Sequence, residues 1–542
     1  MSAVDHGLRD GFHAAGYVAY EAAPAFDRAL SAHSTSPVPL VFFGLFQPPE
    51  VASPLDGSTP PASVRWTPSV TPAEHARGVA AIREAIAAGD TYQINYTFRL
   101  NAALDPSSLD SLYGHLALAE GVPYAAYLDL GDWKILSLSP ELFFERNGSH
   151  LVTRPMKGTA PRGRWAEEDA ARQHELRASA KDRAENIMIA DLCRNDLSRV
   201  CQVGSVRATS LCDTRAHATV WQMTSTVEGE ARPDTGLGDI FSALFPAGSI
   251  TGAPKSSSTQ LIASLESAPR GVYCGAIGFA SPDGRATFNV AIRTMTVNVA
   301  SGMAEYGVGG GITWDSVAAD EHAEALSKAA CLEVRSPFSL IETMRLEDGT
   351  LVRLDRHMAR LQDSAAYLGL PCDPDRVRAA LDLHVALHAT GTWRVRVVLA
   401  PSGQVRAESL EFEEPPAGPA LFALAWAPVD RRDRFLCHKT TRRQVYEWHL
   451  AEHPDVFDVL LWNDRRELTE FTRGNLVVER DGALLTPAHE CGLLAGVFRG
   501  ELLDAGTIRE AILSLDDLPI CSRFWFINSL REWVPIGRTK ER

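Results

Sequence analysis

The sequence predicts a protein of mixed α+β class with antiparallel sheets, divided into at least two domains. The chain has 542 residues, which is too long for one hydrophobic core. Segments with helical spacing of apolar residues stand beside segments that alternate apolar and polar residues. The apolar pattern restarts near residues 332–338. We therefore predict one domain over residues 1–335 and a second over residues 336–542.

The first clear elements follow a proline-rich, loop-like stretch at residues 47–73. Thr71-Pro72-Ala73-Glu74 has the pattern of a helix start with a capping box and proline at the first helical position. Val79, Ile82 and Ile86 follow at helical spacing, and Gly89 is a stop signal. Residues 92–100 then alternate apolar with mostly polar residues, which predicts a strand.

Later elements are predicted in the same way. We expect strands at 133–145 and 286–299, with Arg293 on one strand face with Asn289 and Ala291, and a helix at 183–201. In the second half, a short strand pair precedes a helix that contains Met358 and Leu361. Residues 476–485 are typical of a hairpin that turns at Asp481-Gly482.

Composition limits the function classes. The net charge of −15 argues against nucleic acid or an anionic membrane as partner, since both would repel the chain. The nine cysteines are scattered without a C-x-x-C pair, which is typical of reduced thiols in a cytosolic protein. The first 15 residues contain no apolar run of a signal peptide, and no stretch has the length of a membrane span. We therefore expect a soluble, cytoplasmic protein.

Several polar groups in the first half lie where folding alone does not require them. They are Glu141 beside an apolar strand, Lys157 in Arg154-Pro155-Met156-Lys157-Gly158-Thr159, Glu185 on a helix, Arg293, and Gly309-Gly310-Gly311 before a helix with Glu321 and Glu324 on one face. Taken singly, each of these acids is more often an exposed charge on a helix surface than a functional residue. Residues 248–256 superficially resemble a phosphate loop, but the glycine-to-lysine spacing is wrong and Pro254 precedes Lys255, so we reject a nucleotide site.

Together these segments resemble the chorismate-utilising enzymes, specifically component I of aminodeoxychorismate synthase, from about Gly16 to Lys328. The resemblance implies an antiparallel β-sandwich with flanking helices. It also implies that Glu185 and Glu324 bind Mg²⁺, with Glu321 nearby, and that the ion holds the C1 carboxylate of chorismate. The implied substrate contacts are Gly158, Thr159, Lys255, Tyr273, Arg293, Gly309, Gly310 and Gly311.

Lys157 decides which reaction the resemblance implies. The matching position is typically alanine in anthranilate synthases and lysine in aminodeoxychorismate synthases. In the implied mechanism the amine attacks C2 of chorismate as the 4-hydroxyl leaves, and ammonia then adds at C4 and expels the lysine. Such an amine must be neutral, so we expect burial or a nearby cation to lower its pKa. Glu141 matches the general acid that protonates the departing hydroxyl.

The chain departs from this family in two respects, and it also lacks a glutaminase motif. Gln222 occupies a position where many members have histidine, so an acid–base role of that histidine is absent. The amino-terminal region is short, so the inhibitor pocket of some relatives is expected to be incomplete. No Gly-x-Cys-x-Gly nucleophile motif occurs, so ammonia is expected from solution or from a separate glutamine amidotransferase subunit.

The second half contains, in order, the segments 438–443, 467–476 and 492–500, which resemble fold-type IV pyridoxal-phosphate enzymes from about Phe338 to Arg538. This family includes aminodeoxychorismate lyase and several aminotransferases, and implies an α/β unit of two subdomains. Such an enzyme needs a lysine for a Schiff base, an acid at the pyridine nitrogen and an anion cradle for phosphate. The implied residues are Lys439 as Schiff-base lysine and proton carrier, Glu470 at the pyridinium, Arg360 and the amides of Val497 and Phe498 at the phosphate, and Thr343 as a catalytic threonine.

Three hypotheses about the function remain open from the sequence. The favoured one is a bifunctional enzyme of 4-aminobenzoate, and hence folate, synthesis, in which fusion to the enzyme that makes the lyase's substrate favours lyase over transaminase. The second is an anthranilate-type synthase with an unrelated class IV aminotransferase appended. The third is a non-catalytic scaffold in the second half. Fold-type IV relatives usually dimerise, so we expect a homodimer through the C-terminal half.

Overall fold

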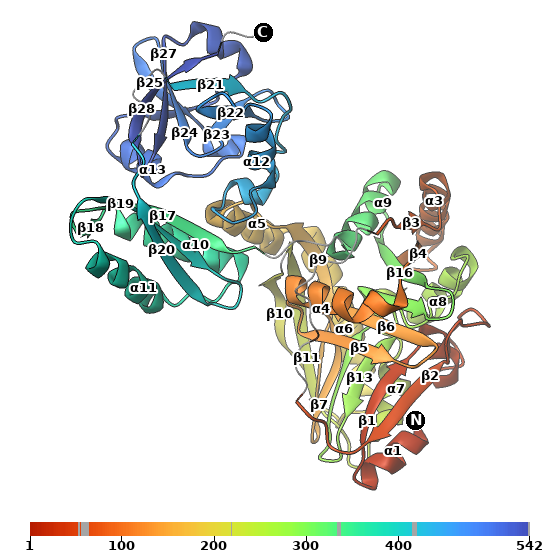
Figure 1. Ribbon diagram of the computed structural model, residues 1–542. Helices are drawn as coiled ribbons and strands as arrows, with labels where there is room; N and C mark the ends of the chain where they lie inside the picture. The colour runs from red at the N-terminus through yellow and green to blue at the C-terminus, as the bar shows by residue number, and fades with distance from the viewer. Residues whose placement is uncertain (52–54, 56–63, 218, 333–337, 415–419, 540–542) are drawn as a thin grey trace. The chain divides into compact units, whose positions relative to one another are not determined.

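The computed structural model describes residues 1–51, 55, 64–217, 219–332, 338–414 and 420–539 (Figure 1). The chain forms two compact units. The first consists of Met1–Arg162 and Arg172–Arg335, and the second of Gly163–Ala171 and Ser336–Arg542. The predicted domain boundary at 335/336 and part of the stretch 47–73 lie outside the described residues. The segment Gly163–Ala171 belongs to the second unit although it comes from the first half of the chain, which the sequence did not predict.

The first unit contains two sheets, and all their pairings are antiparallel. The strand order of the first sheet is β10 (Arg207–Ala216), β11 (Val220–Glu230), β8 (His150–Arg154), β7 (Leu142–Asn147), β14 (Arg285–Val290), β13 (Ala276–Ala280), β1 (His13–Val18), β2 (Val41–Phe46), with β9 (Met156–Pro161) also paired to β11. The second has the order β12 (Gly252–Ala253), β4 (Gln93–Ala103), β16 (Met303–Ile312), β15 (Thr294–Asn298), β6 (Trp133–Ser139), β5 (Tyr124–Asp129), with β3 (Thr67–Pro68) paired to β4.

Each of the two long predicted strands of this unit is divided between the two sheets. Residues 133–145 form β6 and then β7, separated by Pro140, which has no N–H for a sheet ladder. Residues 286–299 form β14 and then β15, separated by a bend in which Arg293 has φ 50°. The expectation that Arg293 shares a strand face with Asn289 and Ala291 is therefore wrong. The two crossings lie together, because Val290 N donates to Glu141 O and Leu138 N donates to Arg293 O.

Helices of the first unit surround these sheets. They are α1 (Ser2–Arg9), α2 (Ala23–Phe26), α3 (Pro72–Ala88), α4 (Leu109–Glu120), α5 (Ala166–Ala178, which begins in the second unit), α6 (Ala180–Ser198), α7 (Leu237–Leu244), α8 (Lys255–Leu265) and α9 (Ala318–Ser327). The predicted start and end of α3 are confirmed. Thr71 Oγ1 accepts from Glu74 N at 3.2 Å, Glu74 Oε2 accepts from Thr71 N at 2.8 Å, and Gly89 is left-handed.

The second unit has two further sheets. One has the order β18 (Thr350–Leu351), β17 (Leu340–Glu347), β19 (Thr392–Leu399), β20 (Val405–Glu411). The other has the order β23 (Leu468–Phe471), β22 (Asp458–Trp462), β21 (Ala420–Leu424), β28 (Glu532–Arg538), β27 (Arg523–Asn528), β24 (Asn475–Arg480), β25 (Ala483–Pro487), β26 (Arg509–Ala511). The helices are α10 (Leu354–Leu368), α11 (Pro374–Leu387), α12 (Gln444–Ala451) and α13 (Val497–Asp504). The predicted hairpin is β24–β25, and its turn residues Asp481 and Gly482 both have positive φ, as a type I′ turn requires.

Gly163–Ala171 is hydrogen-bonded into this second unit. Tyr367 Oη donates to Gly163 O, and His438 Nε2 donates to Arg164 O at 3.0 Å. The Arg164 guanidinium donates to Glu490 O at 2.9 Å. Since His438 immediately precedes Lys439, the segment braces the turn that carries this lysine.

The predicted mixed α+β class is confirmed by this arrangement, whereas the sandwich description stays a prediction. Tyr17 and Ile277 of the first sheet and Ile135 of the second are buried in one apolar cluster, so the two sheets of the first unit share a core. Among the described helices, none has both the length and the apolar character needed to cross a membrane.

Candidate active sites

A cavity of about 270 Å³ in the first unit brings together most of the residues predicted for the first site. The predicted residues that line it are Glu141, Lys157, Gly158, Thr159, Glu185, Tyr273, Arg293, Gly309, Gly311, Glu321 and Glu324. They come from β9, α6, β16, α9, the two crossings between the sheets and, for Tyr273, the turn before β13. Two predicted residues, Gly310 and Lys255, are not among its lining.

Lys157 lies on β9, and its amine reaches the backbone of β16. A methyl group built on Gly311 would lie 2.8 Å from Lys157 Nζ and 2.7 Å from Gln93 Nε2, so only glycine leaves room for both groups. Burial lowers the pKa of Lys157 below its usual value, although Glu185 and Glu141 oppose the shift. The expected depression of this pKa is therefore present, and its main cause is loss of solvent.

Glu321 and Glu324 extend from one face of α9 towards Gly310. A Cβ on Gly310 would lie 3.5 Å from Glu321 Oε2 and 4.0 Å from Glu324 Oε1, so this glycine contributes to the site by leaving space beside both carboxylates. Burial raises the pKa of Glu185 across the cavity, and Glu321 adds to the shift. Burial also acts on Glu324, but Lys328, 3.0 Å away, outweighs it and lowers the pKa of that carboxyl.

These carboxylates fit a hard divalent cation that keeps open positions for substrate oxygens and water. Glu321 Oε1 already accepts from Ser316 Oγ at 2.6 Å, which suits an outer position better than direct coordination. No group of three acidic, histidine or cysteine ligands is gathered closely enough to hold an ion by itself within the described residues. A cation here would be held by Glu185 and Glu324 and completed by ligand oxygens, a pattern usual for Mg²⁺.

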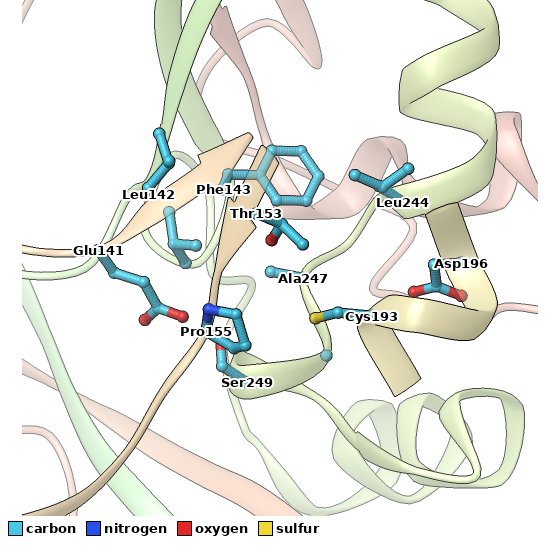
Figure 2. A pocket seen from close by; sticks show the side chains of 12 residues that line it. Glu141, Leu142, Phe143, Thr153, Pro155, Cys193, Asp196, Leu244, Ala247 and Ser249 are labelled. Carbon is cyan, nitrogen blue, oxygen red and sulfur yellow. The ribbon is translucent and has the colours of Figure 1, made fainter. Parts of the chain in front are cut away.

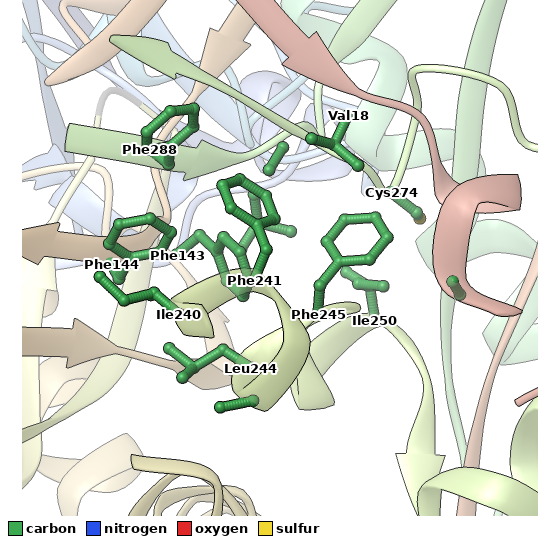
Figure 3. Close-up of a cluster of buried hydrophobic side chains, with 14 of the residues drawn as sticks. Val18, Phe143, Phe144, Ile240, Phe241, Leu244, Phe245, Ile250, Cys274 and Phe288 are labelled. Atoms are coloured by element: carbon green, nitrogen blue, oxygen red, sulfur yellow. The ribbon is translucent and has the colours of Figure 1, made fainter. Parts of the chain in front are cut away.

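Glu141 is positioned by the aromatic core behind it. The next residues on β7 include Phe143 and Phe144, which pack with Phe241 and Phe288 (Figure 3). The ring centroids of Phe144 and Phe288 are 5.1 Å apart. Burial raises the pKa of Glu141 to about 7, against Ser249 and Lys157, which lower it. A carboxyl group with this pKa holds a proton near neutral pH and can act as a general acid.

Lys255 does not reach the cavity. It begins α8, and its Nζ forms an ion pair with Asp196 Oδ2 at 2.8 Å and donates to Leu244 O at 3.1 Å. The structure therefore places Lys255 outside the lining of this cavity, and its contact with substrate stays a prediction. The reason is that α8 and α6 pack so that the lysine meets a buried carboxylate of a neighbouring helix.

Other residues of the site were missed from the sequence. Gln222 Nε2 donates to Gly158 O at 2.9 Å and its Oε1 accepts from Thr159 Oγ1 at 3.0 Å, so it orders the segment after Lys157. Asn95 lines the cavity and Gln93 lies against Lys157, both from the polar face of β4. The sequence feature that could have indicated Asn95 and Gln93 is the polar face of β4, because this face is buried in the structure.

In the second unit, one pocket brings together Lys439, Glu470, Arg360, Thr343 and Val497, all predicted for the second site. Phe498 is the second residue of α13, and its amide is one of the unpaired N–H groups at the start of that helix, as predicted. Burial lowers the pKa of Lys439 to about 8, and Arg360 adds to the shift.

Glu470 is held by three donors inside the second unit. It accepts from Tyr446 Oη at 2.9 Å, from Leu494 N at 3.2 Å and from Asn475 Nδ2 at 3.4 Å. Burial raises its pKa to about 7, although Leu494 and Tyr446 lower it. Tyr446 and Asn475 were not predicted, and their roles depend on contacts between α12, β23 and β24.

Arg360 is fixed by a buried acid. Its Nε and Nη2 donate to the two oxygens of Glu342, each at 2.8 Å, and His357 Nδ1 lies 2.7 Å from Glu342 Oε2. His357 Nε2 is buried without a hydrogen-bond partner among the described residues and lines the pocket. A lysine, an acid, an arginine, free helix amides and an unpartnered imidazole nitrogen together fit the parts of pyridoxal phosphate.

Comparisons with known proteins agree with this division. Residues 47–333 match the family model described as chorismate binding enzyme, and residues 339–538 match the model of class IV amino-transferases. Component 1 of anthranilate synthase from Streptomyces coelicolor is 40% identical over 298 residues, which are 55% of this chain and 57% of that protein. Aminodeoxychorismate synthase from Streptomyces griseus is 43% identical over 252 residues, 46% of this chain and 34% of that protein.

Among solved structures, anthranilate synthase component I from Streptococcus pneumoniae is similar, with a TM-score of 0.54 and 25% sequence identity. The similarity covers 61% of this chain and 84% of that one. The chain therefore spans about half or less of the length of the two curated relatives, and most of the length of the solved one.

Proposed function

The chain belongs to the chorismate-binding enzyme family and carries a class IV aminotransferase domain, and from this we propose that it makes 4-aminobenzoate from chorismate in two steps. The first half would replace the 4-hydroxyl of chorismate by an amino group. The second half would remove pyruvate from the resulting aminodeoxychorismate. The observation that carries the proposal is the buried Lys157 amine, which lies in one cavity with Glu141 and the paired acids Glu185 and Glu324.

In the first step, Lys157 Nζ would form a bond to C2 of chorismate. The ring double bonds shift, the bond from C4 to oxygen breaks, and Glu141 gives its proton to the leaving hydroxyl, which departs as water. Ammonia would then form a bond to C4, and the bond from C2 to Lys157 breaks, which returns a neutral amine. The lowered pKa of Lys157 favours the neutral amine and the raised pKa of Glu141 favours the protonated carboxyl, which are the states that these steps need.

Glu185 and Glu324 would hold Mg²⁺, which would supply positive charge for the C1 carboxylate of chorismate. Other protein groups in the cavity would bind and orient the rest of the substrate. Arg293 and Tyr273 line the same cavity and would orient the rest of the substrate, while Gly309 and Gly311 leave room for its ring. Gly158 and Thr159, ordered by Gln222, would contact the substrate beside Lys157.

Ammonia would come from a separate glutamine amidotransferase subunit, because the chain has no Gly-x-Cys-x-Gly nucleophile motif. The Streptomyces coelicolor relative is named component 1 of anthranilate synthase, which supports a partner of this kind. Ammonium at high concentration would replace the partner in vitro.

In the second step, pyridoxal phosphate would be held by Lys439, by Glu470 at the ring nitrogen, and by Arg360 and the amides of Val497 and Phe498 at the phosphate. When bound, this cofactor supplies an electron sink for the group attached to it. Lys439 Nζ would remove the C4 proton of the substrate, and Thr343, which lines the same pocket, would help to position the departing enolpyruvyl group. We also propose that two copies of the chain form a homodimer through the C-terminal half.

The test is product identification with the full chain, chorismate, ammonium, Mg²⁺ and pyridoxal phosphate. We expect 4-aminobenzoate and pyruvate in equal amounts. Anthranilate as the product would overturn the first step in favour of ortho amination. Accumulation of aminodeoxychorismate without 4-aminobenzoate would overturn the second step alone.

A further inference from the structure

A second, smaller cavity shares Glu141 and Ser249 with the large one (Figure 2). Its volume is about 10 Å³, which is room for a single water molecule. Leu142, Phe143 and Val290 form apolar parts of its wall. Polar groups line the remainder, and none of them has a role in the steps described above apart from Glu141.

The polar lining of this inner cavity comes from three segments. Thr153 lies on β8, and Cys193 and Asp196 lie one turn apart on α6. Ser249 is buried, and its hydroxyl lies close enough to Glu141 to lower the pKa of that carboxyl, but it forms no hydrogen bond of good geometry with Glu141 or another described residue. A buried hydroxyl whose hydrogen bonds are incomplete usually indicates a water molecule, because leaving it unsatisfied costs about 1–3 kcal/mol.

Asp196 connects the inner cavity to a side chain that reaches solvent. Its Oδ2 is 2.8 Å from Lys255 Nζ, and the Lys255 side chain is 13% exposed. Burial raises the pKa of Asp196, while Lys255 and Arg199 lower it. Burial raises the pKa of Cys193 to about 12, and both Asp196 and Glu141 contribute to the shift, so the thiol lies within electrostatic reach of both carboxyls.

The proposed first step consumes a proton from Glu141 in every turnover. Chorismate, ammonia and protonated Glu141 give aminodeoxychorismate in its ammonium form, water and the Glu141 carboxylate. The carboxylate must regain a proton before the next turnover. A substrate that fills the 270 Å³ cavity displaces water from the side of Glu141 that faces Lys157, whereas the inner cavity gives this carboxyl a second side that the substrate does not cover.

We propose that the inner cavity is this route, and that a water molecule at Ser249 and Cys193 passes protons from the Asp196–Lys255 pair to Glu141. A proton leaves the Lys255 ammonium for Asp196, moves through the water to Glu141, and is replaced on Lys255 from solvent. Asp196 is thus a positioning residue that acts through Glu141 and does not touch the substrate. The inference rests on the proposed function, since it concerns the proton that the first step uses.

The test compares the first turnover with later ones. The full-length enzyme with Mg²⁺ is mixed with chorismate and ammonium together, and aminodeoxychorismate plus 4-aminobenzoate is measured by rapid quench. The Asp196→Asn variant keeps the shape of the side chain and a hydrogen bond to Lys255, and Ser249→Ala removes the water's partner. The control is Asp191→Asn, on an exposed face of the same helix.

At a pH of about 6, below the pKa of about 7 of Glu141, most of this carboxyl already holds its proton before mixing, so both variants are expected to complete the first turnover at the wild-type rate. Their steady-state rate should fall about tenfold or more, with a larger solvent isotope effect than in wild type, whereas Asp191→Asn changes neither. Equal losses in the first and later turnovers, or no loss in either, would overturn the relay. If wild type itself forms no aminodeoxychorismate, the proposed function fails, which is a distinct result.

Discussion

The amine of Lys157 lies directly against Gly311, so that a methyl group added to this glycine would be 2.8 Å from Nζ. The two residues are 154 positions apart in the chain and meet because β9 and β16 line the same cavity. The nucleophile of the proposed reaction is therefore positioned by the absence of a side chain on another strand. This relationship and four others lead to measurable predictions.

Gly311→Ala should displace the Lys157 amine and lower kcat for aminodeoxychorismate formation about 100-fold, because a misplacement of about 1 Å can cost that much in a positioned reaction. The measurement is steady-state kinetics with saturating ammonium. The thermal unfolding curve and the circular dichroism spectrum should stay close to wild type. A fully active Gly311→Ala enzyme would contradict the position assigned to the amine.

Lys157→Ala should abolish formation of aminodeoxychorismate, since no amine is then available to attack C2. In the wild-type enzyme quenched with chorismate in the absence of ammonium, mass spectrometry should find a covalent adduct on the peptide that contains Lys157. Unchanged 4-amination by the variant would remove the covalent step from the mechanism.

The rate of the first step should fall as the pH rises through about 7, because Glu141 must be protonated and burial raises its pKa to about 7. Glu141→Gln should remove this alkaline decline and lower the rate by about 100-fold or more, as expected for loss of a general acid. The check is a pH profile of kcat at saturating chorismate. An alkaline limb that persists in the variant would mean that another group titrates.

Tyr446→Phe should weaken binding of pyridoxal phosphate about tenfold. The tyrosine hydroxyl donates to Glu470 and lowers its pKa, so its loss raises that pKa and leaves less carboxylate for the ring nitrogen at pH 7. Titration of the visible absorbance of the bound cofactor measures the effect without turnover. Lys439→Ala should lose this absorbance, and Tyr446→Phe with unchanged affinity would contradict the role of Glu470.

Glu342 should stabilise the second unit in a pH-dependent manner. Burial alone would raise its pKa, but Arg360 and His357 outweigh burial and lower it from 4.5 to about 2. A carboxyl whose pKa is lower in the folded than in the unfolded chain stabilises the fold at any pH above its unfolded pKa. For Glu342 this contribution is about 3 kcal/mol, and it is lost as the pH falls from 4.5 to about 2. Denaturant unfolding of wild type and Glu342→Gln should therefore differ by about this amount at pH 6 and converge near pH 2.

Local signals in the sequence predicted several elements correctly, and the reason is that their causes are local. The capping box of Thr71 and Glu74 fixes the start of α3 and the left-handed Gly89 fixes its end, each through residues within one helical turn of that end. The Asp481-Gly482 turn fixes the hairpin in the same way. The strands 133–145 and 286–299 were predicted too long, because a crossing between two sheets depends on which strands lie next to them.

The candidate sites show the same distinction between features with local causes and features that depend on tertiary packing. Lys157, Lys439 and the acids were predicted as chemical groups in an ordered pattern, and the structure gathers them in two cavities. Lys255 was predicted at the substrate but pairs with Asp196, since helix packing decides which buried charge it meets. Gln93 was predicted on the polar side of a strand, yet it is 1% exposed because α8 contacts β4 and the Gln93 side chain lies beside Gly311 and Lys157.

The sequence by itself determined which amines, carboxyls and glycines are present, the order of the two halves, and the helix ends and turns that depend on neighbouring residues. The tertiary structure alone decided which of these groups are buried together. Burial and distance between remote residues set the pKa values of Lys157, Glu141, Lys439 and Glu470, because solvation and Coulomb interactions act through space and not along the chain.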